Sequence, residues 1–259
     1  MKGSSMIPPE LIDSTLELDG RVAILTMNRN DVRNELTGSR LADEIVTVVD
    51  WINEHEAISA LVLTGAGAAF SAGGNVKHMR NRDSGSFAGD VYTVQNRYRA
   101  GIQRMALAMH RLEVPSIAAV NGPAIGAGCD LACMADVRIA ASTARIGETF
   151  VNLGIIPDDG GGWFLQRLVG YQRAAEMSFS GRLLDAAEAK AVGLFLEVVE
   201  PDELLARARE MAASFAAKPP RTVRLTKRLL KSAQRMELAE HLDLAALVQG
   251  MCHQTEDHA

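Results

Sequence analysis

Apolar runs and helix-like patterns alternate along the first two thirds of the chain. Runs with the length and composition typical of buried strands lie at residues 21–27, 60–65, 116–122 and 137–141. Between them, apolar residues recur with helical spacing at 39–55 and 96–112. Strands that alternate with helices are typical of a largely parallel sheet covered by helices. The pattern therefore predicts an α/β fold for this part of the chain.

The pattern changes from about Asp185 onward. The rest of the sequence is rich in Ala, Leu, Arg and Glu with helical spacing. With 259 residues, of which 47% are hydrophobic, the chain is long enough to bury one sizeable core. We predict a sheet-bearing core at residues 1–195 and a C-terminal helical extension at 196–259.

Charge and composition argue against several classes of partner. The formal net charge of −5 gives the chain no general attraction to nucleic acid. No apolar run reaches the roughly 18 residues of a membrane span, and "MKGSSMIPPE" lacks the apolar segment of a secretion signal. We expect no nucleic acid and no membrane as partner, and a cytoplasmic location by default.

Three cysteines, Cys129, Cys133 and Cys252, are too few for a disulfide framework. Cys129 and Cys133 would share one helix face, but no histidine stands near them to complete a metal site. We interpret all three cysteines as core thiols and predict no metal.

Two glycine-rich loops follow predicted strands, "TGAGAAFSAGGN" at 64–75 and "NGPAIGAGCD" at 121–130. Neither contains the GxxxxGK[ST] pattern of a P-loop, and Leu131 stands where a dinucleotide fingerprint needs a third glycine. Glycines instead allow the backbone to approach a ligand closely, and the second loop leads into a short helix-like run. The two loops could bracket one oxygen as an oxyanion hole, or they could be simple strand-to-helix turns.

A pair of aspartates, Asp158 and Asp159, lies in the apolar and glycine-rich stretch "LGIIPDDGGGWF". One interpretation is local, because Asp is a preferred N-cap residue and a helix is expected to begin near Trp163. The other interpretation is catalytic. The pattern alone does not choose between them.

Four segments together resemble the enoyl-CoA hydratase/isomerase (crotonase) superfamily: "MNRNDVRNEL", "AFSAGGNVKHM", "AAVNGPAIGAGCDLACMADVRIA" and "FVNLGIIPDDGGGWFLQRLVG". The resemblance implies a crotonase-like spiral of ββα units with a C-terminal helical oligomerisation region, in a homotrimer or a dimer of trimers. It implies an acyl-CoA substrate and no separate cofactor, because coenzyme A is part of the substrate. Family members usually continue past "MCHQTEDHA" into a short basic helix, so affinity for CoA is expected to be understated in this form.

The same resemblance assigns candidate binding residues. The thioester oxygen would lie between the backbone amides of Gly74 and Ala127, and Arg33 and Lys77 are candidate partners for the CoA phosphates. Further expected contacts to the substrate are Ala72, Asn75, Phe150 and Trp163. The polar segment at 79–95 is expected to line the acyl pocket.

The carboxylates decide which reaction the resemblance favours. Family hydratases carry two glutamates, but the matching positions here are Asp130 and Phe150, and a phenylalanine cannot activate water. Family isomerases carry their acid/base carboxylate at the position of Asp158, and dienoyl-CoA isomerases also have an aspartate at the position of Asp130. We therefore predict double-bond isomerisation, with Asp158 moving the proton, Asp130 assisting and Asp159 capping the helix.

Two alternatives stay open. The first is an enoyl-CoA hydratase in which Glu148 and Asp130 activate water. The second is a non-catalytic acyl-CoA-binding or RNA-binding protein with the crotonase fold.

Overall fold

The computed structural model describes residues 6–81, 87–255 and 258. Its main sheet has the strand order β1-β2-β3-β4-β6-β9. The first pair is antiparallel and each later pair is parallel. The strands are β1 (Ser14–Asp19), β2 (Val22–Met27), β3 (Ala60–Gly65), β4 (Ser116–Val120), β6 (Val137–Ala141) and β9 (Glu197–Val199). The four predicted strands are therefore confirmed as β2, β3, β4 and β6.

Strand β3 shows why the sheet carries helices on both faces. All six of its residues are buried. Because side chains alternate across a strand, Leu61 and Leu63 pack in the cluster formed with α1 and α4, while Ala60 and Val62 pack in the cluster formed with α8. A strand that is apolar on both faces is typical of a parallel sheet between helical layers.

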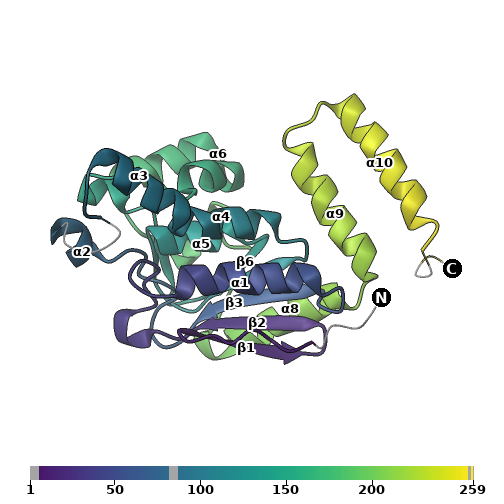
Figure 1. Cartoon of the computed structure of the whole chain (residues 1–259), viewed down its shortest axis with the longest axis horizontal. Coiled ribbons are helices and arrows are strands. Elements are labelled where there is room, and N and C mark those ends of the chain that lie inside the picture. Colours follow the sequence, from purple (N-terminus) through teal and green to yellow (C-terminus); the bar gives the residue numbers. More distant parts are fainter. Residues whose placement is uncertain (1–5, 82–86, 256–257, 259) are drawn as a thin grey trace.

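The helices form a layer on each side of the sheet (Figure 1). Helices α1, α4 and α5 cover one face, and α8 covers the other. The helical segments are η1 (Asn30–Val32), α1 (Leu41–Glu54), α2 (Val76–Asn81), α3 (Val91–Ala100), α4 (Ile102–Arg111), α5 (Ala127–Met134), η2 (Phe150–Leu153), α6 (Gly161–Ser180), α7 (Ala186–Ala191), η3 (Pro201–Glu203), α8 (Leu204–Ala216), α9 (Pro220–Ala233) and α10 (Leu238–Cys252).

The single helix predicted at 96–112 is two helices in the structure, which corrects that expectation. Gly101 ends α3 and begins α4, with φ −106° and ψ −113°. A Cβ at this position would lie 2.8 Å from the Arg97 carbonyl oxygen, so glycine allows the chain to turn closely past the end of α3.

A second, small sheet contains β5 (Ala124–Ile125), β7 (Arg145–Gly147) and β8 (Leu184–Asp185). Ser71, in the loop after β3, forms an isolated parallel bridge to Ala124. This bridge places the loop after β3 beside the loop after β4, which is the feature that builds the site.

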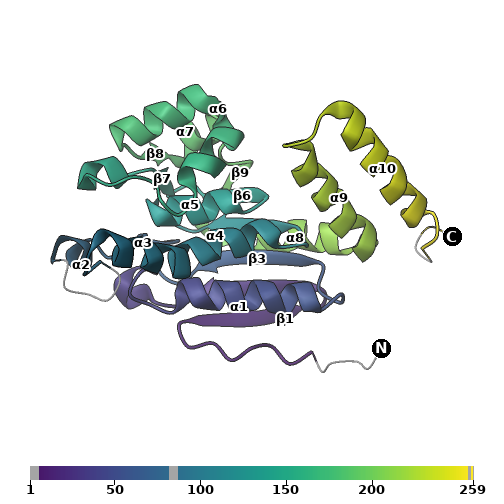
Figure 2. The same ribbon diagram turned by 45° about the horizontal axis from the view of Figure 1, so that its top comes forward.

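Helices α9 and α10 project away from the rest of the fold (Figure 1, Figure 2). Basic side chains hold α9 to the core by donating to backbone carbonyls at and just after the ends of α1 and α4. Arg224 donates to the carbonyls of Ile52, His55 and Ile58, at distances of 3.3, 3.2 and 3.1 Å. Lys231 donates to the His110 carbonyl at 2.5 Å. Strand β9 and helix α8, both beyond residue 195, pack with the sheet, while the predicted boundary at 195/196 stays a prediction.

Helix α10 contains no buried residue. Its large apolar side chains are exposed, and they include Leu238, Leu242, Leu247 and Met251. Cys129 and Cys133 are buried core thiols as expected, but Cys252 is only half-buried because it lies on this projecting helix. Among the described helices, none is long and apolar enough to cross a bilayer.

Candidate active site

The loop between η1 and α1 carries Arg33, and the buried side chain of Asn34 anchors it to the loop after β3. Asn34 is fully buried, and its side-chain amide donates to the carbonyls of Ala66 and Ala69 at 3.0 and 2.9 Å. Arg33 and Asn34 both adopt positive φ, at 54° and 55°. The Arg33 carbonyl then accepts from the Ala72 amide at 2.9 Å. The segment "MNRNDVRNEL" therefore holds the segment "AFSAGGNVKHM" in place through the Asn34 side chain and the Arg33 carbonyl.

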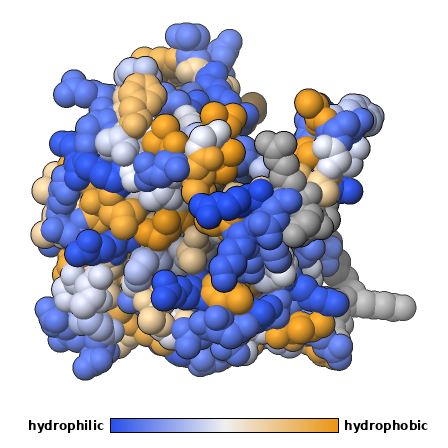
Figure 3. All heavy atoms as spheres, turned by 90° about the vertical axis from the view of Figure 1, so that its left-hand side faces the viewer, coloured by the Kyte–Doolittle hydropathy of each residue, from blue (hydrophilic) through white to orange (hydrophobic). Residues whose placement is uncertain are grey.

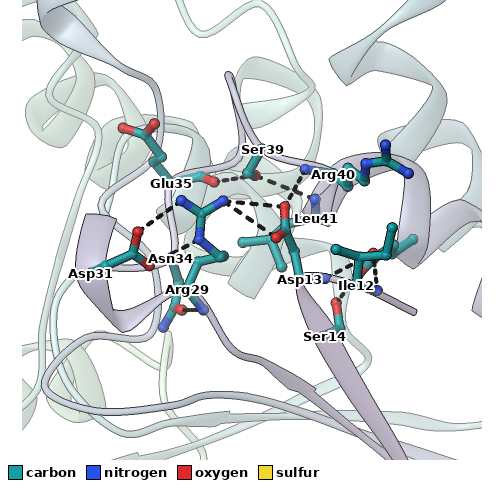
Figure 4. A network of polar contacts seen from close by, with 11 residues as sticks. Ile12, Asp13, Ser14, Arg29, Asp31, Asn34, Glu35, Ser39, Arg40 and Leu41 are labelled. Atoms are coloured by element: carbon teal, nitrogen blue, oxygen red, sulfur yellow. Dashed lines mark hydrogen bonds and ion pairs between the residues drawn. The ribbon is translucent and has the colours of Figure 1, made fainter.

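A polar network fixes the start of that loop (Figure 4). The Arg29 guanidinium pairs with Asp31 at 2.8 Å and with Asp13 at 3.3 Å. The Arg29 amide donates to Oδ1 of Asn34 at 2.8 Å, and the Arg40 amide donates to Oδ2 of Asp13 at 2.7 Å. Each carboxylate in this network faces donors.

The two glycine-rich loops meet through backbone contacts. The Ile125 amide donates to the Ser71 carbonyl at 3.0 Å. A Cβ at Gly73 would lie 3.1 Å from the Ala127 nitrogen, and a Cβ at Gly128 would overlap the Ser71 carbonyl. Glycine is required at both places because the two backbones approach too closely for a side chain.

The amides of Gly74 and Ala127 remain available where the loops meet. Within the described part of the chain, neither N–H donates a hydrogen bond. Ala127 is the first residue of α5, where backbone N–H groups have no partner within the helix and the helix dipole favours negative charge. The geometry is consistent with an oxyanion hole formed by backbone donors.

Other predicted binding residues surround these amides. Arg33 and Lys77 are exposed, and no hydrogen bond or ion pair of their side chains occurs within the described residues. The Asn75 side chain is already engaged, because it donates to both Glu35 oxygens at 3.1 and 3.0 Å and accepts from the His78 amide at 3.0 Å. Asn75 thus shapes the start of α2 rather than offering a free amide group.

Three carboxyl groups lie together at the other end of this region. Asp130 on α5, Glu148 after β7 and Asp159 before α6 are exposed by only 0%, 1% and 2%. None of their six carboxyl oxygens has a hydrogen-bond partner among the described residues. Gly161 leaves space for two of them, since a Cβ there would overlap Oδ1 of Asp130 and lie 2.6 Å from Oε1 of Glu148. We name Asp130, Glu148 and Asp159 the acid cluster.

Burial raises the pKa of every member of the acid cluster, because a charged carboxylate is poorly solvated there. Burial and the charge of Glu148 hold the pKa of Asp130 well above its ordinary range. Burial and Asp130 do the same to the pKa of Asp159. Burial raises the pKa of Glu148 to about 7. In the described regions, no lysine or arginine forms an ion pair with these groups.

Asp158 differs from the acid cluster in being only partly buried. Its carbonyl accepts from the Gln103 side chain at 2.9 Å, which ties the turn to α4. Burial, followed by the charge of Asp159, raises the pKa of Asp158 to about 7. A carboxyl group with this pKa can both take and return a proton near neutral pH.

The expectation that Asp159 caps α6 is wrong. The N-cap residue of α6 is Gly160, whose φ of 121° turns the chain before the helix begins, and no side chain caps the helix. Asp159 instead points into the acid cluster, where Asp130 contacts it directly.

A family model for enoyl-CoA hydratase/isomerase matches residues 17–259. The chain belongs to this family. A short-chain-enoyl-CoA hydratase from Clostridium acetobutylicum is 36% identical over 251 residues, which cover 96% of this chain and 92% of that protein. The enoyl-CoA hydratase structure from Bacillus anthracis superposes with a TM-score of 0.87 at 31% identity, covering 95% of this chain and 93% of that one. The crotonase-like fold and the assignment as an enzyme of this family are thereby confirmed.

A further similar structure comes from Thermobifida fusca, is assigned as an enoyl-CoA hydratase and was solved in complex with CoA. It superposes with a TM-score of 0.82 at 33% identity, covering 95% of this chain and 96% of that one.

This hydratase/isomerase family member has a hollow of about 500 Å³ between α2, α3 and η2. Its lining includes Met79, Phe87, Tyr98, Asn152 and Ile155. The end of the molecule that carries α2 and α3 mixes apolar and polar side chains (Figure 3). Tyr98 connects the hollow to the acids, because burial and the charges of Asp158 and Asp159 raise its pKa.

The two predicted aromatic contacts lie in different places. Phe150 is 6% exposed, and its ring lies 3.7 Å from where a Cβ of Gly126 would be, beside the oxyanion loop. Trp163 packs instead against His110, with ring centroids 5.1 Å apart, and beneath Arg167 at 3.9 Å. That surface lines a separate hollow next to α9, so the structure does not bring Trp163 to the acids.

Sequence reasoning missed that Asp159 joins Asp130 and Glu148, and it gave no role to Tyr98 or Gln103. One signal was available, because the glycine run 160–162 directly follows the two aspartates. Glycines beside acids indicate space for a buried group as well as freedom to turn.

Proposed function

We propose that this enzyme is an acyl-CoA isomerase that moves a carbon–carbon double bond relative to the thioester. The observation that carries the proposal is Asp158, a partly accessible carboxyl with a pKa of about 7 whose charge acts on Tyr98 in the lining of the hollow. Phe150 stands where a family hydratase would need a second glutamate, which further favours isomerisation.

The proposed reaction needs one base and one pair of donors. The thioester oxygen accepts hydrogen bonds from the Gly74 and Ala127 amides, and each such donor typically contributes about 3 kcal/mol to the transition state. Asp158 removes a proton from the acyl chain, and the negative charge moves onto the thioester oxygen as an enolate. Asp158 then returns the proton to another carbon of the chain, the double bond moves, and the carboxylate is restored.

Arg33 and Lys77 are proposed to contact the CoA phosphates. Both side chains are exposed. Arg33 lies on the loop after η1 and its carbonyl accepts from the Ala72 amide, and Lys77 lies on α2, three residues after Gly74. The reaction as written uses no cofactor beyond the CoA of the substrate.

Trimers, alone or paired, are the proposed assembly, with the exposed apolar side chains of α10 as part of the contact. Light scattering after gel filtration measures the number of subunits directly.

The deciding experiment incubates the protein in heavy water with matched 2-enoyl-CoA and 3-enoyl-CoA substrates and follows product masses. Double-bond migration with deuterium incorporation and no added water supports the isomerase. Replacing Asp158 by Asn should then lower kcat by roughly 10²- to 10⁴-fold, the usual contribution of a general base. An Asp158→Asn protein with unchanged turnover would contradict the assignment.

Hydration is the second candidate, because the relatives named above are enoyl-CoA hydratases and because Glu148 lies beside Asp130. Addition of one water across the 2-enoyl bond would favour it. Binding of CoA esters without turnover of any kind would instead support a non-catalytic binding protein.

A further inference from the structure

The acid cluster lacks the groups that normally neutralise buried carboxylates. Its three members come from three separate elements, and each side chain is at least 98% buried, as their exposed fractions of 0%, 1% and 2% show. Unpaired charges in such a place cost several kcal/mol each, so the groups neutralise by holding protons.

Among the described residues, the groups that neighbouring elements bring to the acid cluster supply no counter-charge. Helix α5 contributes Cys129 and Cys133, and α3 contributes the Tyr98 hydroxyl. Arg138 is a buried base near the end of α5, but its guanidinium donates to the carbonyls of Ala132, Ala135 and Leu194. Asp158, on the remaining side, adds negative charge rather than compensating it.

Protons are therefore the available partners for these oxygens. Asp130 and Glu148 lie side by side, because a Cβ on Gly161 would overlap Oδ1 of Asp130 and lie 2.6 Å from Oε1 of Glu148. Two carboxyl groups so close cannot both be ionised without strong repulsion, so the protons of Asp130 and Glu148 are coupled.

We propose that Glu148 is a positioning residue that keeps Asp130 protonated, so that Asp130 serves the reaction as a neutral hydrogen-bond donor and not as a second base. The inference rests on the proposed function for the role of Asp130 at the substrate. It leaves Asp158 as the single base, which explains why the chain can carry two aspartates at the site without two competing proton acceptors.

The test is an infrared titration of the full-length protein in heavy water, from about pH 5 to 9, which brackets shifted carboxyl groups. The carboxylic-acid C=O band distinguishes protonated carboxyls from carboxylates. The wild type should keep this band at pH 7, and Asp130→Asn should remove the part that belongs to Asp130. Glu148→Gln should move the midpoint of the Asp130 band to lower pH, because the amide removes the neighbouring negative charge and can donate to the Asp130 carboxylate. Asp159→Asn is the comparison variant, because Asn keeps a donor beside Asp130 and should leave the midpoint in place.

The matched control is Asp202→Asn, an acid on the exposed η3 segment that should leave the band unchanged. A wild-type protein without the band at pH 7 would overturn the proposal. So would a Glu148→Gln protein in which the Asp130 midpoint does not move while circular dichroism shows the native fold.

A bound cation is the competing explanation, because a Cys129 sulfur and oxygens of Asp130 and Glu148 lie within 4.8 Å of one another. Equilibrium dialysis against Zn²⁺ and Mg²⁺ separates the two cases. Tight stoichiometric binding with release of protons would overturn the proposal, because metal ligands must be deprotonated.

The proposal and the isomerase assignment can fail separately. A retained band in a protein without isomerase turnover contradicts only the function. Isomerase turnover in a protein without the band contradicts only the role of Glu148. If both hold, Glu148→Gln should change the pH profile of kcat rather than KM alone, which loss of packing would not do.

Discussion

Two groups of buried carboxylates in this chain differ in what surrounds them. Asp13 and Glu44 are 8% and 7% exposed, and their oxygens accept hydrogen bonds. Glu44 accepts from the amides of Ile12 and Asp13 and from the Ser14 hydroxyl, at 2.7, 3.0 and 2.6 Å. Arg29 adds a positive charge beside Asp13 (Figure 4). This donor-rich group stabilises the join between β1 and α1.

The acid cluster has comparable burial but no donors. Burial raises the pKa values of its three carboxyl groups, and the negative charge of a neighbouring acid adds to the rise. The comparison shows that burial alone does not decide the role of an acid. Where donors saturate the oxygens, the carboxylate supports the fold. Where donors are absent, the group keeps a proton and becomes available for chemistry.

The largest effect on stability is expected in the donor-rich group. Glu44→Ala leaves three donors without an acceptor and should lower the free energy of unfolding by about 4 kcal/mol. Urea unfolding followed by circular dichroism measures it. Glu44→Gln is the matched control, because its amide keeps one acceptor oxygen and can donate to Ser14, so its cost should be about 1 kcal/mol. Equal losses in the two variants would contradict this account of the network.

The acid cluster should make the free energy of unfolding fall as pH rises. Carboxylates paired with positive charges do the opposite, because they lose stabilisation as pH drops. Its folded-state pKa values are raised, so the folded protein holds protons that the unfolded chain releases. The contribution of Glu148 to the free energy of unfolding is therefore fully present below about pH 4.5 and is lost as pH rises to about 7. For Glu148 alone, the rise of its pKa to about 7 corresponds to about 3 kcal/mol.

Urea unfolding at a series of pH values tests this expectation. Glu148→Gln should be more stable than the wild type at high pH and should lose less stability as pH rises. Asp202→Asn should follow the wild type. A Glu148→Gln protein with the wild-type slope would show that Glu148 is not protonated in the folded state.

A smaller effect is expected from filling the space between the acids. Gly161→Ala places a methyl group against Asp130 and Glu148 and should cost about 1–3 kcal/mol of stability, as overpacking usually does. The control is Gly162→Ala, one residue further along α6, where a Cβ meets nothing within 4 Å. That variant should gain up to about 1 kcal/mol from helix propensity. Thermal unfolding compares the two, and a stable Gly161→Ala protein would contradict the close contact.

The smallest effect is expected where carboxylates are exposed. Arg209 pairs with Glu17 at 2.8 Å and with Asp19 at 3.3 Å on the surface. Arg209→Gln should cost less than about 1 kcal/mol, and added salt should reduce the difference. A larger loss of unfolding free energy that does not change with added salt would contradict this expectation. It would show that these ion pairs stabilise the fold as strongly as the donor-rich group does.

Much of the fold follows from local patterns that the sequence shows directly. The four apolar runs form neighbouring strands of the sheet because each is apolar on both faces. The prediction of one helix at 96–112 was wrong at Gly101, because a single glycine within a helical pattern does not reveal whether the chain turns there.

The site was predictable only in part. Gly74 and Ala127 lie on loops that meet as expected, because glycines mark close backbone contacts. Asp159 was misassigned because capping preference assumes that the helix begins immediately, whereas Gly160 turns the chain first. Trp163 lies elsewhere because α6 directs its aromatic side chain toward His110. Which side of a helix faces the site depends on packing that spans distant segments.

The junction at Gly73 and Gly128 has a consequence for how such an enzyme can change over evolutionary time. Its two candidate oxygen-binding groups are main-chain atoms, so no side chain encodes them, and their position depends on residues that have no side chain at all. Carboxyl groups around them can be exchanged, added or relocated by single substitutions while the amides stay in place. New reactions can thus arise by substitution of carboxyl residues around an unchanged anion-binding backbone. Replacement of either glycine would instead disturb every reaction that uses this backbone.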